Sequence, residues 1–151
     1  MDLCLLHIDH QDIGIPMDAV REVLIHPAVN PLPLAPDFLQ GVTSFRGMCL
    51  PVIELTGLIH QAEQLAARQV KKHQGSRDRV VVCQHDQSTF GLRVDQVGRR
   101  NIPAASTSDE FGQELVKQID IPEQPELTLL NLPQLFKTMT QLMKPQLQHL
   151  S

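Results

Sequence analysis

The sequence of 151 residues predicts a mainly β protein, a single domain over residues 1–151 made of two similar small barrels. Two observations support this fold class. At an offset of 77 residues, the apolar runs, turns and glycines of residues 3–60 fall on those of residues 80–137, and a fixed period is the signature of an internal repeat. Within each half, short apolar runs alternate with polar turns, which is typical of strands. Each half alone is too small to bury a stable core.

Each half begins with a predicted hairpin. In the first half, the apolar run 3–6 leads to the polar turn 9–12 and then to a second run that contains Gly14. The offset carries this pattern into the second half, where Gly91 takes the place of Gly14. A glycine inside a strand predicts a bulge or a sharp bend of the kind that curls a small sheet into a barrel.

A short helical turn is predicted after the second strand of each half. Asp18 and Asp95 stand at equivalent positions there, and aspartate is a favoured capping residue at the start of a helix. Such a turn would present Val20 and Val97 on one face of the protein.

The first half continues with an extended connection and a second hairpin. Four prolines between residues 27 and 36 exclude a helix there. The strand that begins at Gly41 and the run 48–53 are separated by Arg46 and Gly47, where the glycine supplies the positive φ that a tight hairpin turn requires.

Two segments have helical rather than strand patterns. The connector 61–79 contains good helix formers over residues 61–72, followed by a polar loop. Residues 132–143 have the clearest amphipathic pattern, and we expect their apolar stripe to pack on the core of the domain rather than on a partner. The stripe consists of Leu132, Leu135, Phe136, Met139, Leu142 and Met143. Residues 144–151 are expected to form a frayed tail.

Composition argues against several classes of function. A net charge of −4 disfavours a protein that binds nucleic acid through phosphate contacts. The aromatic residues are five phenylalanines, so the Trp and Tyr platforms on which bases stack are missing. No apolar run approaches the ~18 residues that span a bilayer. The N-terminus lacks the pattern of a secretory signal, which predicts a cytoplasmic protein without membrane insertion. Cys4, Cys49 and Cys83 are expected to be reduced and buried.

No set of residues has the spacing of a catalytic or metal site. The seven histidines are scattered, and His7 and His10 could share a metal only with a third ligand. Ser44 and Cys49 have no base nearby in the sequence, and the glycines form no phosphate-binding loop. We therefore expect no metal, no cofactor and no catalysis, while an enzyme that uses Cys49 or a histidine stays open as an alternative.

Several segments together resemble the family of CheW-like domains. Residues 14–23 (GIPMDAVREV) are similar to the first motif of the family, and residues 36–47 (PDFLQGVTSFRG) are similar to the second. The run 50–55 (LPVIEL) completes the second motif, and residues 90–97 (FGLRVDQV) resemble a G-L-x-V-D-x-V motif in the second half. The match covers nearly the whole chain in the right order. Ser44 departs from it, because the family usually has Asn there.

The resemblance implies two intertwined five-stranded, SH3-like β-barrel subdomains with a few short helices. It implies a non-catalytic adaptor that couples chemoreceptors to a CheA-type histidine kinase, in chemotaxis or a related motility pathway. The implied partners are the regulatory domain of that kinase and the helices at the signalling tips of the receptors. The protein would thus be recruited from the cytoplasm to receptor arrays at the inner membrane. A small β-barrel module that binds a ligand or nucleic acid is the alternative.

Particular residues are expected to serve these contacts. Glu22 and Arg46 match functional positions of the family, and we expect a bidentate ion pair between them. At the offset of 77 they fall on Arg99 and Glu123, which is the same pair with its charges exchanged. The expected partner-binding residues are Val20, Glu22, Val23, Arg46, Val94 and Val97. The expected structural residues are Gly14, Gly41, Gly47, Pro51 and Gly91.

Overall fold

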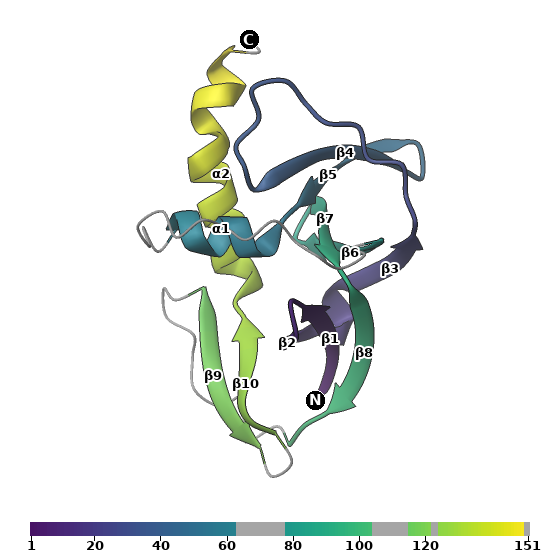
Figure 1. Cartoon of the computed structure of the whole chain (residues 1–151), viewed down its shortest axis with the longest axis vertical. Coiled ribbons are helices and arrows are strands. Elements are labelled where there is room, and N and C mark those ends of the chain that lie inside the picture. The colour runs from purple at the N-terminus through teal and green to yellow at the C-terminus, as the bar shows by residue number, and fades with distance from the viewer. Residues whose placement is uncertain (63–77, 104–114, 122–123, 150–151) are drawn as a thin grey trace.

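The computed structural model of the chain describes residues 1–62, 78–103, 115–121 and 124–149 (Figure 1). These residues form strands, a short 3-10 turn and two α-helices. The strands are β1 (Asp2–Ile8), β2 (Gln11–Pro16), β3 (Val20–Ile25), β4 (Leu39–Phe45), β5 (Met48–Ile53), β6 (Arg79–His85), β7 (Ser88–Val94), β8 (Gln96–Asn101), β9 (Val116–Ile121) and β10 (Gln124–Leu130). The helical elements are η1 (Met17–Ala19), α1 (Leu55–Ala62) and α2 (Leu132–His149).

The strands form two five-stranded sheets. The first sheet has the order β8-β1-β2-β10-β9, and the second has the order β3-β6-β7-β5-β4. Each sheet therefore takes two strands from one half of the sequence repeat and three from the other. The offset of 77 residues carries each of β1 to β5 onto the strand five places later. It thereby carries the order of one sheet onto the order of the other.

The expectation of a mainly β fold with a C-terminal helix is confirmed, but neither sheet closes into a barrel in the described part of the chain. The first sheet ends at the edge strands β8 and β9, and the second at β3 and β4. Strands of the two halves pair in the antiparallel pairs β1–β8 and β3–β6, and in short parallel pairings between β2 and β10 and between β7 and β5. The chain leaves the first sheet after β2, forms the second sheet with β3 to β7, and returns to the first sheet with β8 to β10.

Gly14 and Gly91 lie at these parallel junctions, where they let strands of different halves approach closely. A Cβ added to Gly14 would lie 3.0 Å from Leu129 Cδ2, and one added to Gly91 would lie 3.3 Å from Leu50 Cδ2, each on a strand of the other half. The Gly91 Cβ would also lie 2.5 Å from Val80 Cγ1 on the neighbouring strand of its own half. The hairpin pairing through both glycines is continuous, so the bulges predicted there are not formed. Register shifts occur instead between Val20 and Glu22, between Leu39 and Gly41, and between Gln124 and Leu127.

Side chains on the two faces of a strand enter different apolar clusters. Along β1, Cys4, Leu6 and Ile8 belong to the central core, which both sheets and both helices share. Leu3 and Leu5 belong to a smaller cluster on the other face. The strand β6 shows the same alternation between the central core and a third cluster. Since successive side chains of a strand point to opposite faces, these strands are buried on both faces, which explains their uninterrupted apolar runs.

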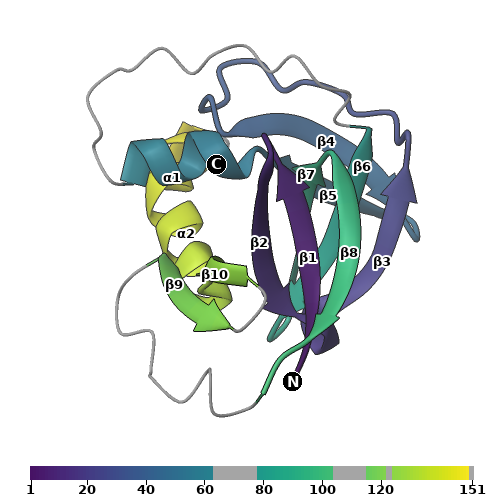
Figure 2. The ribbon, with the colours of Figure 1, turned by 60° about the horizontal axis from the view of Figure 1, so that its bottom comes forward.

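The two helices lie on the side of the molecule opposite β3 (Figures 1 and 2). The described stripe residues of α2 pack on the central core as expected, and Phe136 contacts Phe90 edge-on with ring centroids 4.4 Å apart. The helix continues to His149, beyond its predicted end at residue 143. Most of the connector 61–79 lies outside the described residues. Within the described part of the chain, no helix is both long and apolar enough to cross a bilayer.

The cysteines divide into two buried thiols and one exposed thiol, which corrects the expectation that all three are buried. Cys4 and Cys83 lie in the central core, whereas Cys49 is exposed beside the β4–β5 turn. Burial raises the pKa of the Cys4 thiol to about 11, and it raises the pKa of Cys83 as well. Only Cys49 therefore has ready access to solvent and reagent.

We expect iodoacetamide at neutral pH to alkylate Cys49 alone in the native protein, and all three cysteines after unfolding in urea. Peptide mass spectrometry measures the site and extent of labelling. Native labelling of Cys4 or Cys83 at the rate of Cys49 would contradict the placement of these thiols in the core.

Candidate functional site

The edge strands β3 of the second sheet and β8 of the first both lie on the side of the molecule away from the helices, where they run in different directions (Figures 1 and 2). We call this surface the seam and define it by Val20, Val23 and Val97. These side chains are half-buried and pack against the central core. Glu22 is exposed on the same strand as Val20 and Val23. Four of the residues expected to bind partners therefore lie on these two edge strands.

Val94 does not belong to this surface. Its side chain is 0 % exposed and lies in the central core, so a partner cannot touch it in the folded protein. Val94 ends β7, which is an inner strand of the second sheet. It supports the seam from beneath, and the expectation that it contacts a partner is wrong.

The β4–β5 hairpin forms the second exposed feature with expected site residues. Arg46 (φ 48°) and Gly47 (φ 76°) make its two-residue turn, and the positive φ expected for Gly47 is confirmed. The guanidinium of Arg46 lies 5.3 Å from the centroid of the Phe45 ring, which is a cation–π distance. Met48, which follows the turn, is 52 % exposed. The tip of this hairpin therefore presents a cation beside apolar surface.

The expected ion pair between Glu22 and Arg46 is not formed, although both residues lie in the described part of the chain. Their strands, β3 and β4, are the two opposite edges of the second sheet. In the second half, the Nη2 of Arg99 donates to Asp2 Oδ2 at 2.6 Å, and Glu123 lies outside the described residues. The two residue pairs related by the offset, Glu22 with Arg46 and Arg99 with Glu123, are therefore not shown to be equivalent ion pairs.

The Arg99–Asp2 pair joins β8 to β1 by an exposed ion pair. The hydrogen bond from Arg99 holds the pKa of the Asp2 carboxyl below its ordinary value of 3.8. A carboxyl with a lowered pKa in the folded state contributes stability above its unfolded pKa and loses it as the pH falls through the folded value. The contribution of the pair is therefore present at neutral pH and is lost only as the pH falls below the ordinary pKa of the carboxyl and through its lower folded value. Because both groups are exposed, this contribution is small.

Replacing Arg99 with alanine is expected to raise the pKa of Asp2 toward 3.8. Carboxyl ¹³C chemical shifts followed from pH 2 to pH 6 measure this pKa directly. Arg21→Ala is the matched control, because Arg21 lies on the other edge strand of the seam and bonds Gln84 instead. An Asp2 titration that is the same in Arg99→Ala and in the wild type would show that Arg99 does not set the charge state.

The expected structural residues serve close approaches and turns. Gly41 has a φ of 150°, and a Cβ there would lie 2.2 Å from the carbonyl oxygen of Asn30. Pro51 stands opposite Val42 in the β4–β5 pair. Asp18, expected to cap a helical turn, is exposed and makes no capping bond, because η1 begins after Pro16.

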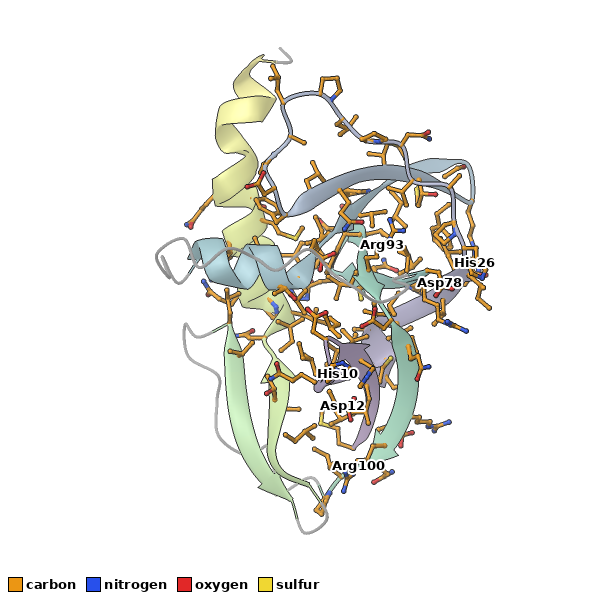
Figure 3. The ribbon with its side chains drawn as sticks, viewed as in Figure 1. His10, Asp12, His26, Asp78, Arg93 and Arg100 are labelled. Atoms are coloured by element: carbon orange, nitrogen blue, oxygen red, sulfur yellow. The ribbon has the colours of Figure 1, made fainter. Side chains whose placement is uncertain are left out.

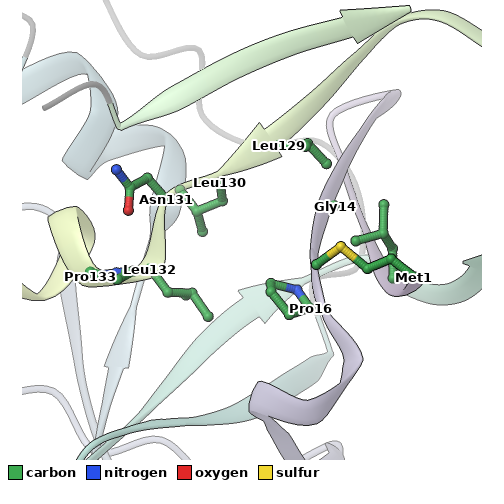
Figure 4. A pocket seen from close by; sticks show the side chains of 9 residues that line it. Met1, Gly14, Pro16, Leu129, Leu130, Asn131, Leu132 and Pro133 are labelled. Carbon is green, nitrogen blue, oxygen red and sulfur yellow. The ribbon is translucent and has the colours of Figure 1, made fainter. Parts of the chain in front are cut away.

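An apolar hollow that the sequence did not reveal opens where β2 and β10 diverge (Figure 4). Its volume is about 280 Å³. Its lining consists of Met1, Leu3, Gly14, Pro16, Leu129, Leu130, Asn131, Leu132 and Pro133. At the equivalent place in the second sheet, Arg93 Nη1 donates to Gln40 Oε1 (2.9 Å) and Gln40 Nε2 donates to Glu54 Oε2 (2.7 Å). In the first sheet the repeat places Pro16 at the position of Arg93, and a proline side chain cannot donate the equivalent hydrogen bond.

Histidines pair with aspartates at three places in the described part of the chain. His26 Nδ1 lies 3.3 Å from Asp78 Oδ2 (Figure 3). His7 Nδ1 lies 2.9 Å from Asp12 Oδ1, and His85 Nε2 lies 3.6 Å from Asp86 Oδ2. Among the described residues, no group of three His, Cys, Asp or Glu side chains is placed to hold a metal ion. The described surface offers half-buried valines on two strand edges and a basic hairpin tip, an arrangement suited to contacts with other proteins.

Comparison with known proteins identifies relatives along nearly the whole chain. The family model described as CheW-like domain matches residues 2–138. Protein FrzA of Myxococcus xanthus is 31% identical over 137 residues, covering 85% of this chain and 81% of FrzA. Protein PilI of Pseudomonas aeruginosa is 31% identical over 97 residues, covering 64% of this chain and 50% of PilI.

The fold also matches a solved structure. The chain superposes on the crystal structure of the scaffolding protein TtCheW from Thermoanaerobacter tengcongensis with a TM-score of 0.61. The two sequences are 18% identical, and the match covers 85% of this chain and 86% of that chain. The two proteins therefore share an architecture of two sheets and a C-terminal helix.

Proposed function

We propose a function from one premise: the chain belongs to the family of CheW-like domains. It acts as a non-catalytic signalling adaptor that couples chemoreceptors to a CheA-type histidine kinase, in chemotaxis or a related motility pathway. It works in the cytoplasm, at receptor arrays beneath the inner membrane. The observation that supports this proposal best is that two exposed features, the seam and the β4–β5 hairpin tip, lie at opposite edges of the second sheet.

The seam suits a helix from a receptor signalling tip. Val20, Val23 and Val97 present branched aliphatic side chains whose inner parts are fixed by the central core. An amphipathic helix packs its apolar face on such a surface. The exposed Glu22 and Arg99 stand on the two strands that border it and would orient the charged residues of the helix.

The hairpin tip suits the regulatory domain of the kinase. Arg46 and the exposed Met48 combine a cation with apolar area, and arginine is enriched among the residues that dominate protein interfaces. The tip lies at the edge of the second sheet opposite β3. Two partners can therefore bind the adaptor at once without competing for one strand edge.

Binding measured separately for each partner tests this assignment. We expect Arg46→Ala to weaken binding of the kinase regulatory domain roughly tenfold, and Val20→Ala with Val23→Ala to weaken binding of a receptor signalling-tip fragment by a similar factor. Lys137→Ala is the control, because Lys137 is exposed on α2, on the side opposite β3. Calorimetric titration gives each affinity, and thermal melting confirms that every variant is folded.

Two results would count against the proposal. If the wild type binds neither partner, the adaptor function is wrong. If every variant, the control included, loses the same affinity for both partners, the two surfaces do not have the separate roles assigned to them.

A further inference from the structure

The chain passes from one sheet to the other at two places, and the repeat makes these places equivalent. The first crossing leads from β2 to β3 through the three residues of η1. The second leads from β7 to β8 through the single residue Asp95. Each crossing is followed directly by one of the two strands that border the seam. The geometry of the crossings therefore fixes how the two walls of the seam face each other.

Asp95 is held by groups from both sheets. Its backbone N–H donates to the carbonyl oxygen of His7 at 2.9 Å, and its carboxylate Oδ2 accepts from the backbone N–H of Asp9 at 3.1 Å. Both of these partners belong to the β1–β2 hairpin of the first sheet. Its carbonyl oxygen accepts a 3.5 Å contact from Nη1 of Arg79, which begins β6 of the second sheet. One residue thus connects a hairpin of one sheet to a strand of the other.

The turn between β1 and β2 is shaped for this contact. Asp9 (φ 50°) and His10 (φ 65°) are both left-handed, as the favoured two-residue hairpin turn requires. Pairing between β1 and β8 ends at His7 and Gln96. The carboxylate of Asp95 then binds the Asp9 N–H and so extends the contact between the hairpin and the crossing by one further bond.

The equivalent residue of the first crossing lacks these contacts. Asp18 is exposed, and its side chain makes no capping hydrogen bond to η1. The two aspartates occupy the same position of the repeat, but only Asp95 joins the sheets. The chain itself therefore supplies a matched control for the role of Asp95.

We propose that Asp95 is a positioning residue: its bonds to His7, Asp9 and Arg79 fix the angle between the two sheets, and thereby the shape of the seam that receives the receptor helix. Asp95 acts on binding through β8 and Val97 and does not itself contact the partner. The part of this inference that concerns the receptor rests on the proposed adaptor function. The part that concerns the angle between the sheets does not.

Four variants of the full chain test the proposal: Asp95→Ala, Asp95→Asn, Asp95→Glu and Asp18→Ala. Asp95→Ala removes the acceptor for the Asp9 N–H, Asp95→Asn keeps an acceptor oxygen without the charge, and Asp95→Glu keeps the charge but displaces it. We expect Asp95→Ala and Asp95→Glu to weaken receptor-fragment binding roughly 3- to 30-fold, the range in which residues that act through others alter binding. Asp95→Asn and Asp18→Ala are expected to bind as the wild type does.

Two measurements without any partner accompany the titrations. Hydrogen exchange of the Asp9 amide is expected to become faster in Asp95→Ala and Asp95→Glu and to stay unchanged in Asp18→Ala. Residual dipolar couplings of β1 and β7 report the angle between the sheets, which we expect to change in the same two variants. If Asp95→Ala does not fold, Asp95→Glu carries the test.

The outcomes separate this inference from the proposed function. Wild-type exchange at Asp9 and an unchanged sheet angle in Asp95→Ala and Asp95→Glu would overturn the positioning role, whatever the binding data show. Weak binding of Asp95→Asn, equal to that of Asp95→Ala, would overturn it as well, because the charge and not the hydrogen bond would then matter. If the wild type binds no receptor fragment, the adaptor function fails, while exchange and couplings still decide the role of Asp95.

Discussion

Gly41→Ala is expected to lower the free energy of unfolding by about 2–5 kcal/mol. An alanine Cβ would lie 2.2 Å from the Asn30 carbonyl oxygen and 2.9 Å from Pro31 Cα. Both obstacles are backbone atoms of the segment that pairs with β4 through Asn30 and Val42, so no side chain can turn aside to make room. The φ of 150° adds strain for any residue with a side chain.

Urea denaturation followed by far-UV circular dichroism measures this loss. Gly98→Ala is the matched control, because Gly98 is also in a strand and a Cβ there has its nearest neighbour at an ordinary 3.6 Å. We expect the control to unfold within about 0.5 kcal/mol of the wild type. Equal urea midpoints of unfolding for Gly41→Ala and Gly98→Ala would show that the backbone around Asn30 does not pack closely against Gly41.

Phe90→Ala is expected to destabilise the fold by about 3–5 kcal/mol. Phe90 is 1 % exposed in the central core and meets Phe136 of α2 edge-on. Its removal leaves a cavity between an inner strand of the second sheet and the C-terminal helix, and a close-packed core closes over such a cavity only partly. We therefore expect the contact between α2 and the sheets to loosen first.

Thermal and urea unfolding measure the stability of Phe90→Ala, and hydrogen exchange along α2 reports on the helix. Ile25→Ala serves as the control, because Ile25 is 63 % exposed and its truncation is expected to cost no more than about 0.5 kcal/mol. A loss for Phe90→Ala as small as that of Ile25→Ala would contradict the shared central core.

The local elements could be predicted from the sequence, because their signals are local. Hairpin turns need Gly, Asp or Asn in left-handed conformations, and the sequence shows such residues at Asp9 and Gly47. The stripe of α2 follows from helical periodicity alone. The exchange of strands between the halves has no such signal. Because the two halves are similar, a hairpin can pair with strands of its own half or with the equivalent strands of the other half. The apolar and polar residues along the strands are compatible with both pairings.

The site was predicted less completely, because it depends on distances across the fold. Val20, Val23 and Val97 occupy the equivalent edge strands β3 and β8 and pack against the same central core. Val94 ends an inner strand and is therefore buried. The ion pair of Glu22 and Arg46 fails because their strands lie at opposite edges of one sheet, which no sequence offset reveals.

The central claim is that the chain couples a receptor to a kinase, and a bridging assay tests it most directly. A receptor signalling-tip fragment is immobilised, and the amount of CheA-type kinase retained is measured with and without the adaptor. We expect retention of the kinase to rise with added wild-type protein and to be much lower with the same concentration of Arg46→Ala, while that variant itself stays on the receptor. Kinase retention that is the same with and without the wild-type protein would contradict the account.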